Sequence, residues 1–413
     1  MLGKIIKLKN IIKFVIINIL RIFVGILFSC IVKRNENIFL FSCNPGQKGD
    51  LFLHNTKYFF LYLNSQIFDF KTIWLCDNED IISGLKRYGY KHIYKRYSLK
   101  GIYYALRAKY WFTDYNIADT TYSFLAYNAI GINFWHGASG LKKCGLDDPN
   151  GNKLIRKNNF ISYIYNVLRL KDTYFIVNSN YEIQCRETAF NAKKEQFVLL
   201  SSPRLDVLYN DISNAEMFME EDFNYIKSLK DNGKKIIIYM PTFRETGKDV
   251  SDWLYSNNLK NILNKNNLVI ICKLHPFDKN NLNTNLNENF YIMESYSDVH
   301  PILKLTDAMI TDYSGIYFDY LHLDKPIIYH VPDLEEFEKQ CRGFYRPYET
   351  LTAGKHTKTE EDLFKEILNI SNGIDNYKVK RKRLLDEMFI YQDGKNCVRV
   401  IEWIRSLNNA KNS

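Results

Sequence analysis

The sequence predicts an α/β protein with doubly wound parallel sheets in two strand-rich halves. Short apolar runs alternate with longer mixed stretches along most of the chain. Many of these runs are β-branched or aromatic and almost continuously apolar, which is typical of parallel strands covered on both faces. A length of 413 residues suggests two or three domains at roughly 100–200 residues each. The expected architecture is therefore a doubly wound α/β fold.

The first element is a basic, apolar segment over residues 1–36. It contains seven Lys or Arg residues and no acidic residue before Glu36. A helical arrangement gathers polar residues near one stripe and large apolar residues away from it, which predicts an amphipathic helix in the interface of an anionic membrane. A tilted signal anchor, a cleaved signal peptide and a helix packed on the body are the alternatives, and the longest uncharged run, Ile22 to Val32, is short for a spanning helix.

Eleven strands are expected after this segment. They are Ile38–Cys43, Thr72–Cys76, Tyr110–Thr113, Ile132–Trp135, Tyr174–Asn178, Phe197–Leu200, Ile236–Met240, Leu268–Leu274, Phe290–Met293, Ala308–Thr311 and Ile327–Tyr329. Apolar spacing predicts crossover helices within Ile161–Leu170, Ala215–Leu229 and Leu363–Ile370. The acidic stretch Asn210–Gly233 is a candidate connection between an N-terminal domain, residues 37–210, and a C-terminal domain, residues 211–413.

The distribution of charges and cysteines argues against nucleic-acid binding and for reduced thiols. The net charge is +10, but seven of these charges lie in the first 35 residues. The body is nearly balanced and carries no zinc-finger, basic-zipper or RNA-binding signature, so nucleic-acid binding is not expected. The eight cysteines are scattered without CxxC or zinc spacing, and Cys76 and Cys272 lie in apolar runs typical of reduced, buried thiols. The pattern indicates a cytosolic protein.

Unusual residues follow five of the predicted strands, where open α/β sheets bind ligands. The clusters are Phe134–Gly137, Ser202–Asp206, Met240–Arg244, Lys273–Pro276 and Thr311–Gly315. His136, placed at a strand end, suits a general base for a hydroxyl nucleophile, with Lys142 and Lys143 nearby to hold an anion. A capping or core histidine is the alternative interpretation.

The remaining clusters predict a phosphate site. Lys273 and His275 alternate at a strand end, so their side chains are expected on the same side, where they suit a phosphate whose leaving oxygen gains charge. Thr311, Asp312, Ser314 and Gly315 precede an expected helix, and Ser314 with the backbone N–H groups around Gly315 suits an anion. Simple N-capping by Asp312 or Ser314 is the alternative.

Three arginines are further candidates for binding phosphate. Arg244 and Arg204 each lie near a proline at a strand end and suit a bidentate contact. Arg342 is a weaker candidate, because an exposed charge pair is the commoner role. No metal constellation is apparent, and the chain lacks GxGxxG after its first strand, a P-loop and a GxSxG elbow, which disfavours dinucleotide, P-loop and serine-hydrolase functions.

Taken together and in order, these motifs resemble the CDP-glycerol glycerophosphotransferase family. The matching residues are His54–Lys57, Trp135–Gly137 with Leu141–Lys143, Ser202–Asp206, Tyr239–Arg244, Lys273–Pro276, Ile310–Ser314 with Phe318–Asp319, Lys325–Pro326, Asp333–Leu334, Arg342–Phe344 and Asp393–Gly394. Each motif is weak alone, but their order over residues 50–405 is specific.

The resemblance implies a glycosyltransferase-B-like fold with the donor bound in the C-terminal half and catalysis in the cleft. It implies transfer of an alditol phosphate, glycerol phosphate being the expected unit, from a CDP-alditol to a hydroxyl of a polyprenyl-diphosphate-linked glycan, with release of CMP. The CDP-activated donor is a substrate, and no cofactor is implied. The expected place is the cytoplasmic face of the membrane, as a peripheral protein in teichoic-acid or capsule synthesis.

The resemblance also implies residue roles. His136 would be the general base, and His275 would stabilise the pyrophosphate or leaving group. Arg244, Ser314 and Asp319 would belong to the donor site, with Asp319 ordering hydroxyls or neighbouring side chains. The chain departs from the family in the loop Ala138–Lys142, one residue longer than the usual form, and at Gly315, where many members carry serine. A nucleotide-sugar glycosyltransferase of the same fold and a catalytically silent membrane scaffold are the alternatives.

Overall fold

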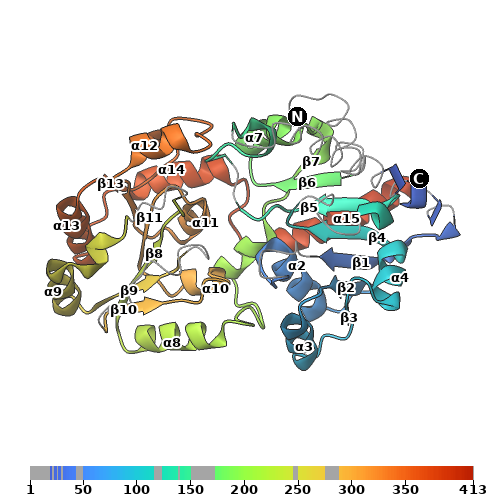
Figure 1. Ribbon diagram of the computed structural model, residues 1–413, viewed down its shortest axis with the longest axis horizontal. Coiled ribbons are helices and arrows are strands. Elements are labelled where there is room, and N and C mark those ends of the chain that lie inside the picture. The colour runs from blue at the N-terminus through green and yellow to red at the C-terminus, as the bar shows by residue number, and fades with distance from the viewer. Residues whose placement is uncertain are drawn as a thin grey trace, which may run out of the picture.

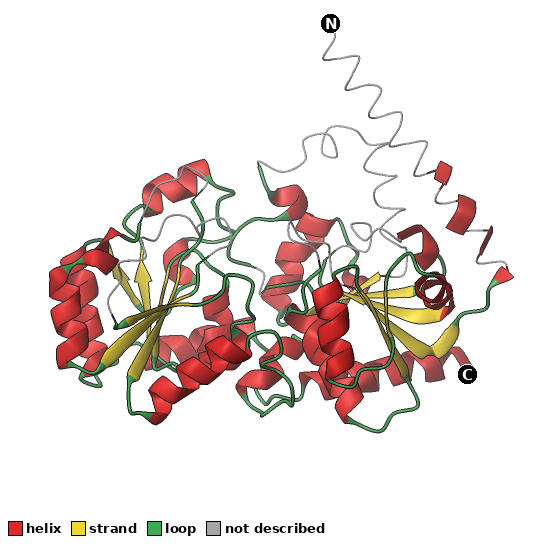
Figure 2. Cartoon of the chain, turned by 60° about the horizontal axis from the view of Figure 1, so that its bottom comes forward, coloured by secondary structure: helices red, strands yellow, loops and turns green. Residues whose placement is uncertain are grey.

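The computed structural model divides into two α/β halves that lie side by side (Figure 1). It describes residues 19–20, 23–25, 27–28, 31–42, 50–115, 123–137, 140–149, 173–244, 250–274 and 288–412. Each half is built on one parallel sheet with helices on both faces (Figure 2). The α/β expectation is therefore confirmed.

The N-terminal half contains a seven-stranded sheet of order β3-β2-β1-β4-β5-β6-β7. Its strands are β1 (Asn35–Ser42), β2 (Lys71–Leu75), β3 (Ile93–Tyr94), β4 (Ala108–Thr113), β5 (Ile130–Asn133), β6 (Thr173–Val177) and β7 (Phe197–Leu199). All neighbouring strands pair in parallel. The strand order reverses between β1 and β4, which places the ends of these strands at a topological switch point.

The C-terminal half contains a six-stranded parallel sheet of order β10-β9-β8-β11-β12-β13. Its strands are β8 (Lys235–Met240), β9 (Leu268–Cys272), β10 (Phe290–Ile292), β11 (Ala308–Thr311), β12 (Ile327–His330) and β13 (Lys355–Thr357). Its switch point lies between β8 and β11. Every strand expected from the sequence overlaps a strand of the structure, and the two strands not expected, β3 and β13, are short and lie at sheet edges.

Helices connect these strands and cover the sheets. The α-helices of the N-terminal half are α2 (His54–Ser65), α3 (Glu79–Arg87), α4 (Leu99–Arg107) and α7 (Asn180–Phe190). Those that follow are α8 (Glu220–Asp231), α9 (Asn257–Lys265), α10 (His300–Leu303), α11 (Ile316–Tyr320), α12 (Leu334–Gln340), α13 (Glu360–Ser371), α14 (Lys378–Met388) and α15 (Asn396–Asn412). Short 3-10 turns lie between them, among them η5 (Pro203–Leu208).

The three helices expected from the sequence have different outcomes. The expectation at Leu363–Ile370 is confirmed by α13. The helix expected from Ala215 begins only at Glu220, because Asn214 and Phe218 adopt positive φ angles of 64° and 66° that interrupt a right-handed helix. The helix expected at Ile161–Leu170 lies outside the described residues.

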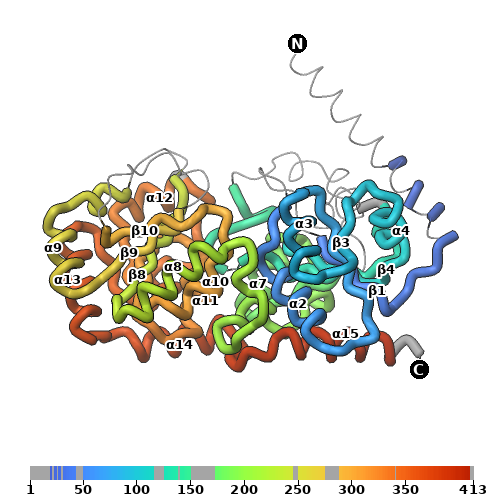
Figure 3. Tube along the Cα trace, turned by 90° about the horizontal axis from the view of Figure 1, so that it is seen from below, coloured from blue at the N-terminus to red at the C-terminus, as the bar shows by residue number. Residues whose placement is uncertain are grey.

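The last helix, α15, returns to the N-terminal half (Figure 3). Its buried residues Cys397, Val400, Ile401 and Ile404 pack in the same apolar cluster as Phe39 of β1. The start of α15 is capped from η5, because the Asp206 carboxylate accepts from the backbone N–H groups of Asn396 at 2.9 Å and Cys397 at 2.8 Å. The final helix therefore ties the two halves together although the preceding elements belong to the C-terminal half.

The N-terminal basic segment is described only in part. Among its described residues, Phe23 and Ile31 expose 65% and 71% of their surface. Most of the amphipathic helix expected over residues 1–36 lies outside the described residues. Among the described helices, none has both the length and the apolar character needed to cross a membrane.

Candidate active site

A cavity of about 500 Å³ lies between the two halves. The N-terminal half contributes Leu51, Leu53, His54, Tyr115, His136 and Gly137 to its lining. The C-terminal half contributes Lys273, Ser295–His300, Ser314–Ile316 and Asp319. Several of these residues directly follow β4, β5, β9 and β11, so the cavity lies at the carboxyl ends of both sheets, where α/β folds bind ligands.

His136 reaches the cavity from a fixed turn after β5. The preceding residue, Trp135, has a φ of 61°. Its N–H donates to the Asn133 side chain at 2.8 Å, and its carbonyl accepts from the Asn55 side chain at 2.6 Å. These two hydrogen bonds hold a left-handed conformation that a tryptophan rarely adopts. The turn therefore orients the next side chain, His136, into the cavity.

The hydrogen bonding of His136 leaves one ring nitrogen for substrate. Its Nδ1 lies 3.4 Å from the backbone carbonyl of Asp114. A carbonyl only accepts, so Nδ1 carries the proton in this contact and Nε2 has a free lone pair. Burial lowers the pKa of His136 to about 4. The imidazole is therefore neutral near pH 7, which is the form that accepts a proton.

The start of α2 joins several parts of the site. The backbone N–H and the hydroxyl of Thr56 both donate to the Asp114 carboxyl group, at 3.1 Å for the N–H. Asn55 accepts from the Arg204 backbone N–H at 3.0 Å while it donates to Trp135. Residues 54–57, one of the motifs in the sequence, therefore fix the positions of the loops after β4, β5 and β7 relative to one another.

Two buried ion pairs connect the halves beneath the cavity. Arg204 binds Asp319 with two hydrogen bonds, Nε to Oδ2 at 2.7 Å and Nη2 to Oδ1 at 2.9 Å. Lys57 Nζ lies 2.9 Å from Asp298 Oδ2. All four side chains expose 3% or less of their surface. Removing one partner of such a pair leaves an uncompensated buried charge, so these contacts fix the two halves relative to each other.

His300 links the two pairs into one interdomain network, which comprises Lys57, Asp298, His300, Asp319 and Arg204. Its Nδ1 lies 2.9 Å from Asp298 and its Nε2 lies 3.0 Å from Asp319. Carboxylates only accept, so both ring nitrogens carry a proton and His300 is cationic. Burial lowers the pKa of His300, but the hydrogen bonds to the two carboxylates outweigh burial and the net shift is upward.

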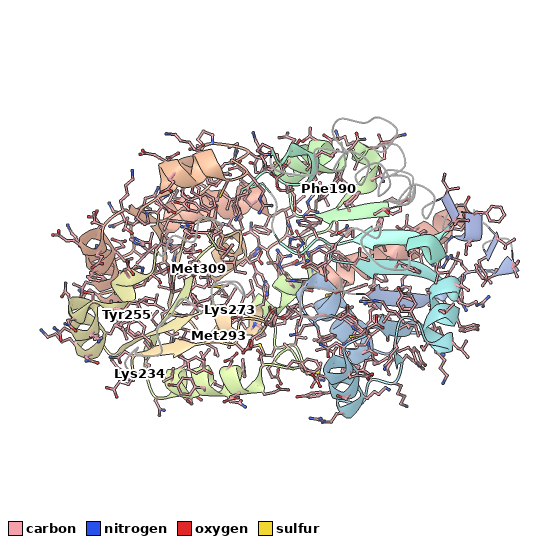
Figure 4. All side chains as sticks on the ribbon, viewed as in Figure 1. Phe190, Lys234, Tyr255, Lys273, Met293 and Met309 are labelled. Atoms are coloured by element: carbon pink, nitrogen blue, oxygen red, sulfur yellow. The ribbon has the colours of Figure 1, made fainter. Side chains whose placement is uncertain are left out.

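The wall formed by the C-terminal half contains Lys273, Ser314 and Gly315. Lys273 lies past the end of β9, on the side that faces the N-terminal half (Figure 4). Its ammonium group donates to the backbone carbonyls of Glu294 at 2.9 Å and Ser295. It therefore supports the loop that leads to Asp298. Ser314 and Gly315 are half-buried and precede α11, which has only five residues.

Arg244, Asp312 and Thr311 lie behind this wall. Arg244 pairs with Asp333 at 2.7 Å and with Asp312 at 2.8 Å. Asp312 also accepts from the Thr242 N–H at 2.8 Å, and the Thr311 hydroxyl donates to the Met240 carbonyl at 2.7 Å. These contacts join the loops after β8 and β11 at the switch point. The Arg244 guanidinium is thus already bound by two carboxylates.

Lys142, Lys143 and Arg342 form a separate contact between the halves. Lys142 pairs with Phe344 in an antiparallel bridge, and the Lys143 N–H donates to the Gly343 carbonyl at 3.0 Å. Burial, with Arg342 nearby, lowers the pKa of Lys142 to about 8. Arg342 lies 3.8 Å from Asp148 and is 45% exposed. These three residues connect loops but do not line the cavity.

The cavity thus unites five residues predicted from the sequence: His136, Lys273, Ser314, Gly315 and Asp319. Arg204 and Asp319 form a salt bridge, so Asp319 orders neighbouring side chains. His275, predicted to stabilise the leaving group, lies outside the described residues. In the part of the chain that is described, no three His, Cys, Asp or Glu side chains gather in a metal-holding cluster.

The sequence interpretation gave no role to four residues of the site: His54, Tyr115, Asp298 and His300. His54 belongs to a motif that supports the family resemblance, so a signal was present there. Asp298 precedes the short helix α10 and His300 is its first residue, and no motif marked either of them. Tyr115 follows β4, and its ring stacks on His136 with centroids 4.6 Å apart.

Comparisons with known proteins agree with this geometry. The model of a family described as CDP-glycerol:poly(glycerophosphate) glycerophosphotransferase matches residues 26–406. A teichoic acid poly(glycerol phosphate) polymerase of Bacillus spizizenii is 29% identical over 395 residues, which cover 90% of this chain and 93% of the relative. The teichoic acid ribitol-phosphate polymerase TarK of Staphylococcus aureus is 30% identical over 282 residues, 66% of this chain but only 51% of TarK.

Solved structures show the same arrangement of two parallel sheets. The wall teichoic acid polymerase TagF, in a variant soaked with CDPG, superposes with a TM-score of 0.72 at 22% identity and covers 100% of both chains. A putative UDP-N-acetylglucosamine 2-epimerase from Listeria monocytogenes gives a TM-score of 0.52 at 12% identity, over 91% of this chain and 97% of the epimerase. These similarities establish a glycosyltransferase-B-like fold.

Proposed function

Because this chain belongs to the CDP-glycerol:poly(glycerophosphate) glycerophosphotransferase family, we propose that it transfers glycerol phosphate from CDP-glycerol to an acceptor hydroxyl. The family makes the chain a transferase of teichoic acid synthesis and implies a CDP-glycerol donor. The acceptor in this proposal is a glycan on a polyprenyl diphosphate. Support for glycerol over ribitol comes from the relative that matches nearly the full chain.

The observation that carries the proposal is the neutral His136 imidazole in the cavity between the halves. Its Nδ1 is held by the Asp114 carbonyl at 3.4 Å, and its Nε2 has a free lone pair. A hydroxyl nucleophile needs such a base because its proton must leave as the new bond forms. Lys273, Ser314 and Gly315 line the same cavity from the C-terminal half, where the donor is proposed to bind.

The proposed reaction is one displacement at phosphorus. The acceptor oxygen forms a bond to the phosphorus that carries glycerol, and its proton passes to His136 Nε2. The bond between this phosphorus and the bridging oxygen breaks, and CMP leaves with the electron pair. Ser314 and the Gly315 backbone N–H are proposed to bind the pyrophosphate, since donors placed where charge develops lower the barrier. His275 remains the predicted group beside the leaving oxygen.

A nucleotide-release assay tests this function. The purified chain is incubated with CDP-glycerol, CDP-ribitol and a panel of nucleotide-sugars, each with a membrane acceptor fraction, and the nucleotides released are separated by chromatography. We expect CMP from CDP-glycerol and its loss in His136→Ala. Release of nucleoside diphosphate from a nucleotide-sugar alone would establish a glycosyltransferase instead.

The basic N-terminal segment is proposed to hold the enzyme at an anionic membrane surface. The exposed Phe23 and Ile31 support this role. Arg34 belongs to the folded body instead, because its guanidinium donates to the carbonyls of Ala105 at 2.8 Å and Ala108 at 2.7 Å. A truncation lacking residues 1–31 therefore keeps this anchor. We expect it to lose sedimentation with vesicles rich in anionic lipid and to retain CMP release on a soluble acceptor; unchanged sedimentation would contradict the membrane role.

A further inference from the structure

His54 lies in the same cavity wall as His136, where three rings from different elements meet. The two imidazole centroids are 6.0 Å apart. Tyr115 stacks on His136 at 4.6 Å and approaches His54 edge-on at 6.2 Å. We call His54, Tyr115 and His136 the three-ring wall. It belongs entirely to the N-terminal half and lines the same cavity as Lys273 and Ser314 of the C-terminal half.

The ring of His54 makes no hydrogen bond with any residue that the structure describes, although it lines the cavity. The other described histidines each bind a partner through a ring nitrogen, for example His300 to two aspartates and His330 to the Thr357 hydroxyl at 3.1 Å. Polar groups at a protein's interior normally find such partners. The His54 ring is therefore available to a ligand in the cavity.

The backbone at His54 also departs from the usual conformation. Its φ is 64°, a left-handed value that few residues other than glycine adopt. The next residues hold it there, since Asn55 binds the Trp135 carbonyl and Thr56 binds Asp114. Strain of this kind persists where the surrounding structure imposes it, and it is concentrated at functional sites. Here the conformation accompanies a side chain that lines the cavity.

The chemistry of His54 suits a hydroxyl group better than a phosphate. Burial, with His136 nearby, lowers the pKa of His54 to about 3. The ring is therefore neutral near pH 7 and offers one N–H donor and one nitrogen acceptor. A hydroxyl matches both functions, whereas an anionic phosphate oxygen only accepts. Such a ring adds no positive charge to the cavity.

We propose that His54 binds the acceptor by hydrogen-bonding one hydroxyl of a vicinal diol while His136 takes the proton from the neighbouring, attacking hydroxyl. This inference rests on the proposed function and names its acceptor chemistry: a chain end that carries two adjacent hydroxyl groups. His54 is then a specificity residue that contacts the acceptor, and the donor binds the opposite wall. No covalent step is assigned to His54.

The test compares two soluble acceptor analogues with the full-length enzyme and CDP-glycerol. One is an alkyl ester of glycerol 3-phosphate, which ends in a vicinal diol, and the other is the matched 3-hydroxypropyl phosphate ester, which lacks the second hydroxyl. We expect the wild type to favour the diol by about tenfold in kcat/KM, the size of one hydrogen bond. His54→Gly should lose this preference, and His54→Asn, which keeps hydrogen-bonding groups and tolerates positive φ, should recover part of it.

Two further measurements separate binding from a structural role. The KM for CDP-glycerol should change by less than about twofold in His54→Gly, since a hydrogen bond to the acceptor contributes only to acceptor binding. The Tm of His54→Gly should equal or exceed that of the wild type, because glycine adopts the left-handed backbone without strain. An unchanged diol preference in His54→Gly would overturn the role of His54. A lower Tm together with equal losses of affinity for the acceptor and for CDP-glycerol would overturn it as well. A wild type that releases no CMP with either analogue or the membrane fraction would overturn the proposed function itself.

Discussion

The three-ring wall and the interdomain network are neighbours in one cavity, but their side chains are bonded in opposite ways. In the wall, His136 makes one long contact of 3.4 Å and the ring of His54 has no hydrogen bond to the described residues. In the network, Asp298 and Asp319 each bind two or more side chains. The two neutral imidazole rings are thus open to substrate, while the charged groups of the network are bound to one another.

This difference separates reacting groups from the framework that positions them. A base must exchange its proton with substrate, so its hydrogen-bonding capacity has to remain partly unused. Buried charges require the reverse, because an unpaired ion in the interior costs several kcal/mol. Arg244 follows the second pattern, with two carboxylate partners. Charge at a strand end is therefore a weaker indicator of substrate contact than an imidazole with a free nitrogen.

The largest effect on activity is expected from removing the base. His136→Ala should lower the rate of CMP release about 10²–10⁴-fold, the usual contribution of general-base catalysis. Its Tm should stay close to that of the wild type, since His136 makes only one long hydrogen bond in the fold. His92→Ala, at the distant strand edge before β3, is the matched control and should retain full activity. More than a tenth of wild-type activity in His136→Ala would place the base elsewhere.

Breaking the interdomain network should act on stability first. Arg204→Met leaves Asp319 without its bidentate partner and should lower the free energy of unfolding by about 3–5 kcal/mol. Lys382→Met removes an exposed pair with Asp386 and should cost at most about 1 kcal/mol. Denaturant titration measures both. Equal losses in the two variants would show that burial gives the network no special role.

The pH dependence of activity distinguishes a buried neutral base from an exposed one. With the pKa of His136 lowered to about 4, protonation of the base begins only well below pH 6. The value of kcat/KM should therefore change less than about twofold between pH 8 and pH 5.5. An ordinary histidine with a pKa of about 6.5 would lose roughly tenfold over this range. An acid limb near pH 6.5 would contradict the neutral three-ring wall.

The smallest effect is expected at Asp114, which joins the wall to α2. Burial raises the pKa of Asp114 to about 7, so the folded state holds a proton that the unfolded state releases near pH 4. The wild type should thus lose stability as pH rises from 4 to 7. Asp114→Asn still accepts from Thr56 and has no such loss. Its Tm should match the wild type at pH 4 and exceed it by about 3–6 °C at pH 8; a constant difference across pH would refute the raised pKa.

The sequence by itself determined the local elements and the order of the motifs. Continuous apolar runs such as Ile236–Met240 form buried parallel strands because both faces of the sheet are covered. His136 and Ser314 each follow a strand at the carboxyl end of their own sheet, which is where ligands bind in such folds. The edge strands β3 and β13 were not predicted, because strands of two and three residues are too short to show a hydrophobic pattern.

Only the tertiary structure decided which charges are free and which are paired. Arg204 and Asp319 are 115 residues apart, and Lys57 and Asp298 are 241 apart, so no local pattern relates them. The return of α15 to the N-terminal half and the approach of His54 to His136 likewise depend on how the two sheets face each other. The spacing of apolar residues predicts which faces of a single helix or strand are buried. The role of a side chain depends instead on partners that folding brings from distant parts of the chain.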